Sequence, residues 1–462
     1  MRRTTAAVVA AAAAVLAGGC GREVVCPAGE VACAGACTTL AGDARNCGDC
    51  GRACPAGEAC AAGTCTACAA ACGSARGCSG GVCLPDVAVA CFNTGDVRGV
   101  DRDLAQVGAP LPTDEGPIAF AGIGSRLWVA NSLSNTLSEL HLGPPAPWST
   151  RGAAALHLFA NLGAGFDDLE DLVADGGLLY ASNAAVNTLV VVDPAAGVID
   201  EVPVGSGFDF PQGLAVAGGR AFVALNGGNA LAVVDVSREA GCQPPDPAAP
   251  ACDASCVAPR TCVAGRCQRA LCGQLLGRID VAALASPGGS ALPARLLADA
   301  SGARPPRLFA VLNNLVTSDF SYRPAGNGRL AVVDLDSGAL DAAAPVLDLG
   351  ADCQNPADLA LLGQTLWVTC GYYDFFGTRA ITGAAFVPVD LSGPAPTVGA
   401  AVPVTGVAPG SLAFCGGQGF AGDRASGKLL RLDPTTHELA AAAICPPSAG
   451  GLAQVAGVAC AP

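Results

Sequence analysis

From Gly116 to the C-terminus, short apolar runs alternate with Gly, Asn and Asp in a repeating pattern. A typical unit, such as Leu179–Asp193, has an apolar run that ends near Asn, a polar turn, and a second apolar run that ends in Val-Asp or Leu-Asp. Such runs between turn residues are typical of strands joined by hairpins. The uninterrupted run Leu189–Val192 predicts a strand that is buried on both faces.

The pattern gives six full units and the beginning of a seventh, Gly450–Cys460, for which we expect two strands. We expect the missing strands of this unit at the other end of the repeat region, in Cys91–Val100 and Asp101–Pro112. Several short strands per unit indicate the four-stranded blades of a propeller. We therefore predict an all-β fold, a seven-bladed β-propeller whose terminal blade is shared by N- and C-terminal strands, because sharing removes two exposed sheet edges.

The units also resemble a known family. Trp128–Ser132 reads W-V-A-N-S, Asn135–Leu137 reads N-T-L, and Val191–Asp193 reads V-V-D. These elements resemble the YVTN/NHL-like family of bacterial β-propellers over residues 91–462, without the insert 242–272. The resemblance implies the propeller fold and leaves the activity open, since propellers host many functions.

The chain has 25 cysteines, many of them in segments poor in large apolar residues. Three segments share the spacing C-x5-C-x4-C: Cys54/Cys60/Cys65, Cys72/Cys78/Cys83 and Cys256/Cys262/Cys267. Such segments cannot bury a core and need cross-links. Cys47 and Cys50 also have the spacing of a zinc knuckle, but no His occurs in the first 140 residues, and an exported chain favours disulfides.

The first cysteine-rich segment resembles a second family. Asp43–Cys54 reads D-A-R-N-C-G-D-C-G-R-A-C, which resembles the module of the stigma-specific protein family over Cys26–Cys65. The resemblance implies a small cysteine-rich module and no particular activity. We expect this module to form a stalk over residues 20–90, and the insert 242–272 to protrude from one face of the ring as a stapled knob.

Six cysteines remain for the ring. We predict a Cys91–Cys460 disulfide that locks the shared blade, because the two residues fall on neighbouring strands of that blade. The further predicted pairs are Cys353 with Cys370 and Cys415 with Cys445.

The N-terminus has the pattern of an export signal. Arg2 and Arg3 precede the apolar stretch Ala6–Ala17, which is too short to span a bilayer. The small residues before Cys20 resemble the bacterial lipobox, which implies a signal peptide over residues 1–19 and an acyl anchor on Cys20 as the membrane contact. The alternative is an ordinary signal peptide with Cys20 in a disulfide. Because Gly21 is not the Asp that often retains lipoproteins in the inner membrane, the resemblance implies an exported lipoprotein of the outer membrane or cell surface.

Charge and hydropathy exclude two classes of protein. The formal net charge of −14 argues against a nucleic-acid partner, which requires a basic face. The mean hydropathy of +0.45 would fit a membrane protein. However, the longest charge-free stretch, Leu391–Gly422, is interrupted by four Pro residues and could not form a spanning helix.

An acidic cluster is the candidate metal site. Its members are Asp167, Asp168, Glu170 and Asp171. Together they could bind Ca²⁺, the one cofactor we consider, because this ion prefers carboxylate and carbonyl oxygens. The alternative is that these carboxylates are solvated.

Four Asn residues follow equivalent strands, so a ring would place them at one level. They are Asn131, Asn183, Asn226 and Asn313. One interpretation places them around the central channel as ligand-binding residues whose side-chain carbonyls could hold a cation, and the other has each Asn cap its own turn.

Four aromatic residues form a further candidate surface: Tyr372, Tyr373, Phe375 and Phe376. They could bind a ligand or pack over their own blade. The three histidines lie in no pattern typical of a metal site or triad, and no convincing G-x-S-x-G motif occurs, so nucleophile–His catalysis is unsupported.

These observations favour a surface-anchored lipoprotein that acts as a non-enzymatic binding scaffold through its propeller, with a surface protein or a glycan as ligand. The alternative is an extracellular, metal-dependent propeller enzyme of the lactonase or lyase type. An enzyme needs acid and base residues that converge at the mouth of the channel, and the sequence offers few Glu or His residues there.

Overall fold

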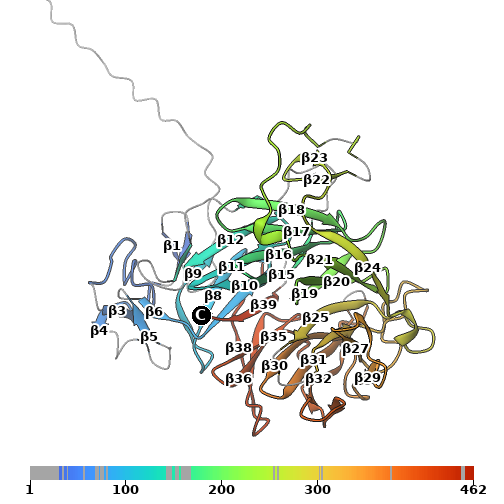
Figure 1. The fold of residues 1–462 in the computed structure, drawn as a ribbon. Helices are drawn as coiled ribbons and strands as arrows, with labels where there is room; N and C mark the ends of the chain where they lie inside the picture. The colour runs from blue at the N-terminus through green and yellow to red at the C-terminus, as the bar shows by residue number, and fades with distance from the viewer. Residues whose placement is uncertain are drawn as a thin grey trace, which may run out of the picture.

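A computed structural model describes residues 31–33, 36–38, 40–55, 58–67, 72, 77–79, 82–141, 148–150, 156–157, 168–252, 255–256, 260–300, 302, 305–374, 377–448 and 453–461. Seven sheets surround a common axis, so the predicted all-β, seven-bladed propeller is confirmed (Figure 1). The predicted signal peptide, Cys20, Asp167, Phe375 and Phe376 lie outside the described residues.

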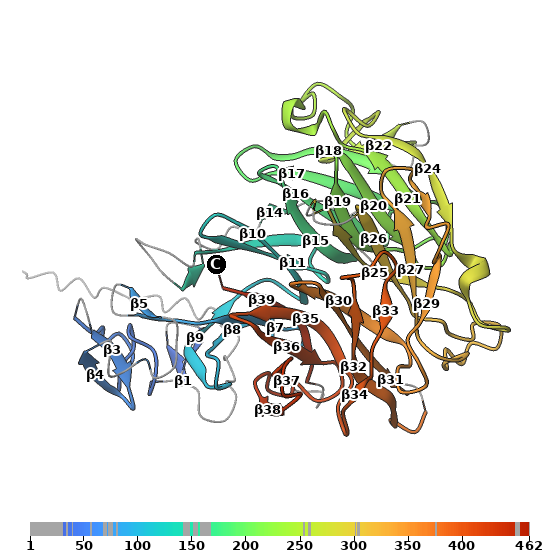
Figure 2. The ribbon, with the colours of Figure 1, turned by 60° about the horizontal axis from the view of Figure 1, so that its bottom comes forward.

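Each blade is an antiparallel sheet whose strands run from the channel to the rim in chain order, except that the shared blade begins with the C-terminal strand β39. The inner strands are β39 (Val455–Cys460), β10 (Pro117–Ile123), β15 (Leu169–Asp175), β19 (Pro211–Ala217), β25 (Pro293–Asp299), β30 (Pro356–Leu362) and β35 (Pro409–Cys415). In this order, each inner strand contacts the next, and β35 contacts β39 to complete the circle (Figure 2).

The second and third strands form the middle of each blade. The second strands are β7 (Val87–Cys91), β11 (Arg126–Asn131), β16 (Leu178–Asn183), β20 (Arg220–Leu225), β26 (Arg307–Leu312), β31 (Thr365–Tyr373) and β36 (Gln418–Asp423). The third strands are β8 (Asp96–Val100), β12 (Thr136–His141), β17 (Thr188–Asp193), β21 (Ala230–Asp235), β27 (Arg329–Asp334), β32 (Ile381–Asp390) and β37 (Lys428–Leu432). Leu189–Val192 is buried on both faces, as predicted, because neighbouring blades pack against each side.

The outer strands are shorter and less regular. They are β9 (Gln106–Pro112), β13 (Ser149–Thr150) with β14 (Leu156–His157), β18 (Gly197–Pro203), β24 (Gln274–Asp280), β28 (Ala339–Leu340) with β29 (Val346–Asp348), β33 (Thr397–Val398) with β34 (Val402–Pro403), and β38 (Leu439–Ala443). Two short 3-10 helices, η1 (Glu239–Gly241) and η2 (Ala282–Leu284), lie on either side of β24 in the chain. The part of the chain that the structure describes contains no helix with the length and apolar character to cross a bilayer.

The shared blade is confirmed, but its division differs from the prediction. The described C-terminal residues supply one strand, β39, and the N-terminal segment supplies three, β7, β8 and β9. Gly457 is not part of a turn. Instead, it lies inside β39 where a Cβ would be 2.6 Å from the carbonyl oxygen of Ile118 in the next blade. This Gly therefore marks a close approach of two backbones.

The predicted Cys91–Cys460 and Cys415–Cys445 disulfides are wrong, and the observed pairs are Cys91–Cys445 and Cys415–Cys460. Because β39 and β7 are antiparallel, Cys460 lies opposite Val87, four residues before Cys91. At about 3.4 Å per residue, this separation is about 14 Å, beyond the reach of a disulfide. Cys415 ends an inner strand, whereas Cys445 follows the outer strand of the same sheet, so these two also lie far apart. The predicted Cys353–Cys370 pair is confirmed.

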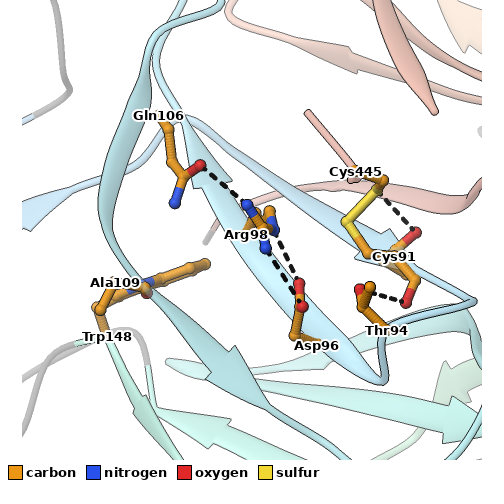
Figure 3. A network of polar contacts seen from close by, with 9 residues as sticks. Cys91, Thr94, Asp96, Arg98, Gln106, Ala109, Trp148 and Cys445 are labelled. Atoms are coloured by element: carbon orange, nitrogen blue, oxygen red, sulfur yellow. Dashed lines mark hydrogen bonds and ion pairs between the residues drawn. A yellow bond between two sulfur atoms is a disulfide. The ribbon is translucent and has the colours of Figure 1, made fainter. Parts of the chain in front are cut away.

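Figure 3 shows how the shared blade is held beside the Cys91–Cys445 disulfide. Arg98 on β8 is buried and pairs with Asp96 at 3.0 Å, and it donates to the side chain of Gln106 at 3.3 Å. Trp148, from the next blade, is also buried and donates its indole N–H to the carbonyl oxygen of Ala109 at 2.9 Å. Polar and apolar contacts thus join the two blades at the point where the ring closes.

The cysteine-rich repeat is a real structural unit. Its hairpins are β3–β4 (Glu58–Ala61, Thr64–Ala67), β5–β6 (Gly77–Ser79, Val82–Leu84) and β22–β23 (Thr261–Val263, Arg266–Gln268). In every copy the first and third cysteines are bonded: Cys54–Cys65, Cys72–Cys83 and Cys256–Cys267. The N-terminal region also contains the hairpin β1–β2 (Val31–Cys33, Ala36–Thr38) and the disulfides Cys33–Cys50 and Cys47–Cys60. The disulfide interpretation of Cys47 and Cys50 is therefore confirmed.

The insert sits on the rim of the ring and does not project from one face, in contrast to our expectation (Figure 1). It packs against β18, the outer strand of the preceding blade, and its Val263 is completely buried between blades. The Asp200 carboxylate of β18 accepts hydrogen bonds from three successive backbone N–H groups of the insert and its exit, Leu271, Cys272 and Gly273. These contacts fix the insert at the rim.

Candidate functional site

All seven inner strands begin with a β-bulge, and these bulges line a central cavity of about 340 Å³. The bulges interrupt the register at the start of each strand. At least one residue of each lines the cavity, and at equivalent places these are Ile118, Glu170, Gln212, Ala294, Ala357, Gly410 and Ala456. A bulge changes the direction of the side chains at that point of a strand. Here the bulges place residues at the start of every inner strand next to the cavity. We call the side of the ring where inner strands begin and second strands end the cavity face.

Two Asp residues in equivalent bulges tie neighbouring blades together. Asp171 accepts a hydrogen bond from the backbone N–H of Leu214 at 3.0 Å, and Asp358 accepts one from Leu412 at 2.8 Å. Each bond runs to the inner strand of the following blade. Burial raises the pKa of Asp358 to about 6, although Arg295 lowers it. Both carboxylates thus fix neighbouring inner strands to one another around the cavity.

Arg295 spans the cavity to reach a different blade. Its Nη1 lies 2.7 Å from Oδ1 of Asp171 and donates to the carbonyl oxygen of Glu170 at 3.1 Å. Burial opposes the charge of Arg295, but neighbouring acidic side chains, first Asp171 and then Asp358, outweigh burial and raise its pKa. The charge of Arg295 is therefore neutralised within the protein.

Glu170 is the ionisable cavity residue with the most perturbed acidity. Burial, followed by the charge of Asp168 and a hydrogen bond to it, raises the pKa of Glu170 to about 8. Arg295 opposes this shift without cancelling it. At neutral pH, Glu170 is therefore largely protonated, and its carboxyl group is hydrogen-bonded to Asp168.

The structure places a guanidinium, and not three converging carboxylates, in the predicted metal cluster. Asp168 accepts a hydrogen bond from the hydroxyl of Ser132, and Asp171 is paired with Arg295. Within the described ranges, two groups of three side chains bring their ligand atoms close enough to hold one metal ion, and neither includes a residue of this acidic cluster. Both contain cysteines that form disulfides. The geometry around Glu170 therefore offers a proton donor and an ion pair.

The four candidate Asn residues do not form one ring around the channel. Asn131 donates to the carbonyl of Thr136 and the hydroxyl of Ser138, and Asn183 accepts from the backbone of Ala185, so both stabilise their own turns. Asn226 and Asn313 instead donate to carbonyl oxygens at the start of the next inner strand, those of Pro293 and Pro356. Of the four, Asn313 lines the cavity.

Of the candidate aromatic residues, Tyr372 and Tyr373 lie where β31 and β32 extend as a long hairpin at the cavity face. Both are half-buried. Other apolar side chains in loops of this face are more exposed: Leu133, Val186, Phe208, Phe210, Phe320 and Tyr322. Phe208 and Phe320 are 82% and 81% exposed, and Phe208 lies beside Phe210 with ring centroids 5.7 Å apart. Exposed aromatic side chains therefore gather on the face that contains the cavity.

Of the cavity residues that the sequence analysis missed, two are charged, Arg295 and Arg424. Most inner strands begin with Pro and have Leu three residues later, as in Pro293–Leu296 and Pro356–Leu359. The two residues between them form the bulge, so an alignment of the units on this Pro and Leu would have placed Arg295 next to the channel. Arg424 follows a second strand and has no comparable signal.

Comparisons with known proteins give a family-model match for the N-terminal region and similar folds for the propeller. Residues 10–68 match the model of the stigma-specific STIG1-like protein family. No curated protein sequence matches the chain significantly.

Among solved structures, the chain is similar to a functionally unknown protein from Desulfotomaculum acetoxidans, with a TM-score of 0.51, 11% identity, and coverage of 81% of this chain and 98% of that one. It is also similar to a putative 6-phosphogluconolactonase from Bacteroides uniformis, with a TM-score of 0.50, 13% identity, and coverage of 77% and 94%. A protein from Lactobacillus plantarum gives a TM-score of 0.50, 13% identity, and coverage of 80% and 98%. At these identities the similarity concerns the fold alone.

Proposed function

We propose that this protein is an exported, acyl-anchored binding scaffold that recognises its ligand with the cavity face of the propeller. The observation that carries the proposal is the concentration of exposed apolar side chains on that face, around a polar cavity. Exposed aromatic side chains beside a concave polar site are typical of binding surfaces. The many disulfides and the lipobox-like Cys20 support display outside the cytoplasm.

A double substitution tests the binding face. Phe208→Ala with Phe320→Ala removes its two most exposed large apolar side chains, while Leu276→Ala removes one that is 55% exposed on β24, at the rim. On a panel of immobilised glycans and surface proteins, we expect the double variant to lose at least tenfold in affinity for the ligand of the unmodified protein. The Leu276 variant should bind normally. Equal binding by all three proteins would show that the cavity face is not the binding surface.

Metabolic labelling with a radioactive fatty acid in a bacterial host tests the anchor. The full chain should take up label and fractionate with membranes, whereas Cys20→Ala should do neither. Label that persists in the variant would contradict the anchor.

A second candidate function, an extracellular lyase or lactonase-type enzyme, is favoured by one residue. The protonated Glu170 is a potential general acid in the cavity. Glu170→Gln keeps a neutral hydrogen-bonding group but cannot transfer a proton, so a scaffold should bind its ligand as before. If the unmodified protein converts the ligand and the variant only binds it, the protein is an enzyme.

A further inference from the structure

Arg424 reaches the cavity because Gly410 has no side chain in its path. It follows β36, and its aliphatic stem crosses Gly410, where a Cβ would lie 2.8 Å from Cγ and 3.1 Å from Cδ of Arg424. Gly410 is the one cavity-lining bulge residue without a side chain. The Nη2 atom donates to the carbonyl oxygen of Gly371, which fixes the guanidinium against the neighbouring blade. Arg424 is thus positioned at the cavity by contacts on two sides.

The positive charge of Arg424 lacks the neutralisation that Arg295 has. Among the described residues it forms no ion pair, and its Nε is buried without an acceptor. Burial lowers the pKa of Arg424 to about 10, because Asp423 compensates the charge only in part. The Asp423 carboxylate is engaged by the backbone N–H groups of Ala408 and Ala425. A buried cation without a partner is costly, so an anion in the cavity would be stabilised there.

Other cavity groups also have unused hydrogen-bonding capacity. The Ser411 hydroxyl, in the same bulge as Gly410, is buried without a partner in the described structure. The side-chain amides of Gln212 and Asn355 line the cavity and form no hydrogen bond with any described residue. A protonated Glu170 would not repel an anion. These groups could bind the polar part of a ligand whose negatively charged group contacts Arg424.

We infer that the cavity binds a small organic monocarboxylate, whose carboxylate accepts hydrogen bonds from Arg424 and Ser411; this inference rests on the proposed binding function. The nearby charges of Asp171 and Asp358 disfavour a doubly charged anion such as a phosphate monoester. At roughly 30 Å³ per water-sized group, the cavity of about 340 Å³ has room for a sugar acid or an acid of similar size.

Calorimetric titration of the full chain tests this inference. The probes are the sodium salts of glucuronate, lactate, benzoate and N-acetylglycinate, each compared with its uncharged primary amide, together with glucose 6-phosphate. We expect at least one carboxylate to bind at least tenfold more tightly than its amide and than the phosphate. Since hydrogen bonds to charged groups contribute about 1.5–3 kcal/mol, Arg424→Gln should weaken binding about 10- to 150-fold.

Matched variants keep the test decisive. Arg126→Gln removes the same charge from a half-exposed residue at the opposite face and should bind normally. Ser411→Ala should also weaken binding, and it covers the case in which Arg424→Gln does not fold. The inference is overturned if no probe prefers the carboxylate, or if the soluble Arg424 and Ser411 variants bind like the unmodified protein. If neutral glycans still bind and depend on Phe208 and Phe320, the proposed scaffold function survives that failure.

Discussion

The Cys91–Cys445 disulfide closes the longest covalent loop described in the protein, and its removal should cost more than removal of a short one. The bond joins residues 354 positions apart, whereas Cys353–Cys370 joins residues 17 apart. All four cysteines are buried. Replacement of either pair by Ala therefore removes similar side-chain contacts, and the main difference between the two variants is the length of the loop that is opened.

The expected costs follow from the loss of chain entropy in the unfolded state. For a loop of 354 residues, the chain-entropy relation gives about 6 kcal/mol at 25 °C. For a loop of 17 residues, it gives about 3 kcal/mol. We therefore expect Cys91→Ala with Cys445→Ala to lower the free energy of unfolding by about 3 kcal/mol more than Cys353→Ala with Cys370→Ala does.

Urea unfolding of both double variants, followed by tryptophan fluorescence, measures this difference. Hydrogen exchange on the same samples should show faster exchange in β39 and β7 for the long-loop variant alone, because these strands meet where the ring closes. Equal losses of stability, or a larger loss from the short-loop variant, would refute the entropic account of ring closure.

Three further predictions test other parts of the structure. Burial raises the pKa of Glu201, which accepts a hydrogen bond from the backbone N–H of Ala264 in the insert, to about 8 from an ordinary value of 4.5. The protonated Glu201 contributes its full stability below pH 4.5, and this contribution is lost as the pH rises to about 8. Glu201→Gln should therefore flatten the decline of the urea midpoint over this pH range. An unchanged slope would assign the decline to other groups. Trp148→Ala should lower the free energy of unfolding by about 3–5 kcal/mol, because it empties a buried site between two blades, and a loss under about 1 kcal/mol in a urea titration would contradict that packing. Gly410→Ala should displace Arg424 by steric conflict and weaken carboxylate binding in calorimetry as Arg424→Gln does, whereas normal affinity would show that the stem of Arg424 has another path.

Local sequence pattern was sufficient for the blades. The run Leu189–Val192 is buried on both faces, as its uninterrupted apolar character indicated. The spacing C-x5-C-x4-C likewise identified a unit with one repeated cross-link. In both cases the interacting residues are close in the chain, so their spacing restricts the geometry directly.

The sequence was less informative where residues far apart in the chain meet. It indicated that Cys91 would help to close the ring, but the antiparallel direction of β39 and β7 places Cys460 out of reach and leaves Cys445 as the partner. It also placed Glu170 and Asp168 in one acidic cluster, but it indicated neither the burial of Glu170 nor its contact with the distant Arg295, both of which affect its acidity.

By itself, the sequence determined the kind of each element and the number of blades, because these depend on hydrophobic period and turn chemistry within a few residues. The tertiary structure alone decided the disulfide pairs of the closing blade, the protonated state of Glu170 and the position of Arg424 over Gly410. The physical reason is that pairing, desolvation and charge neutralisation depend on distances through space. In a closed ring, those distances are set only when the last strand joins the first blade.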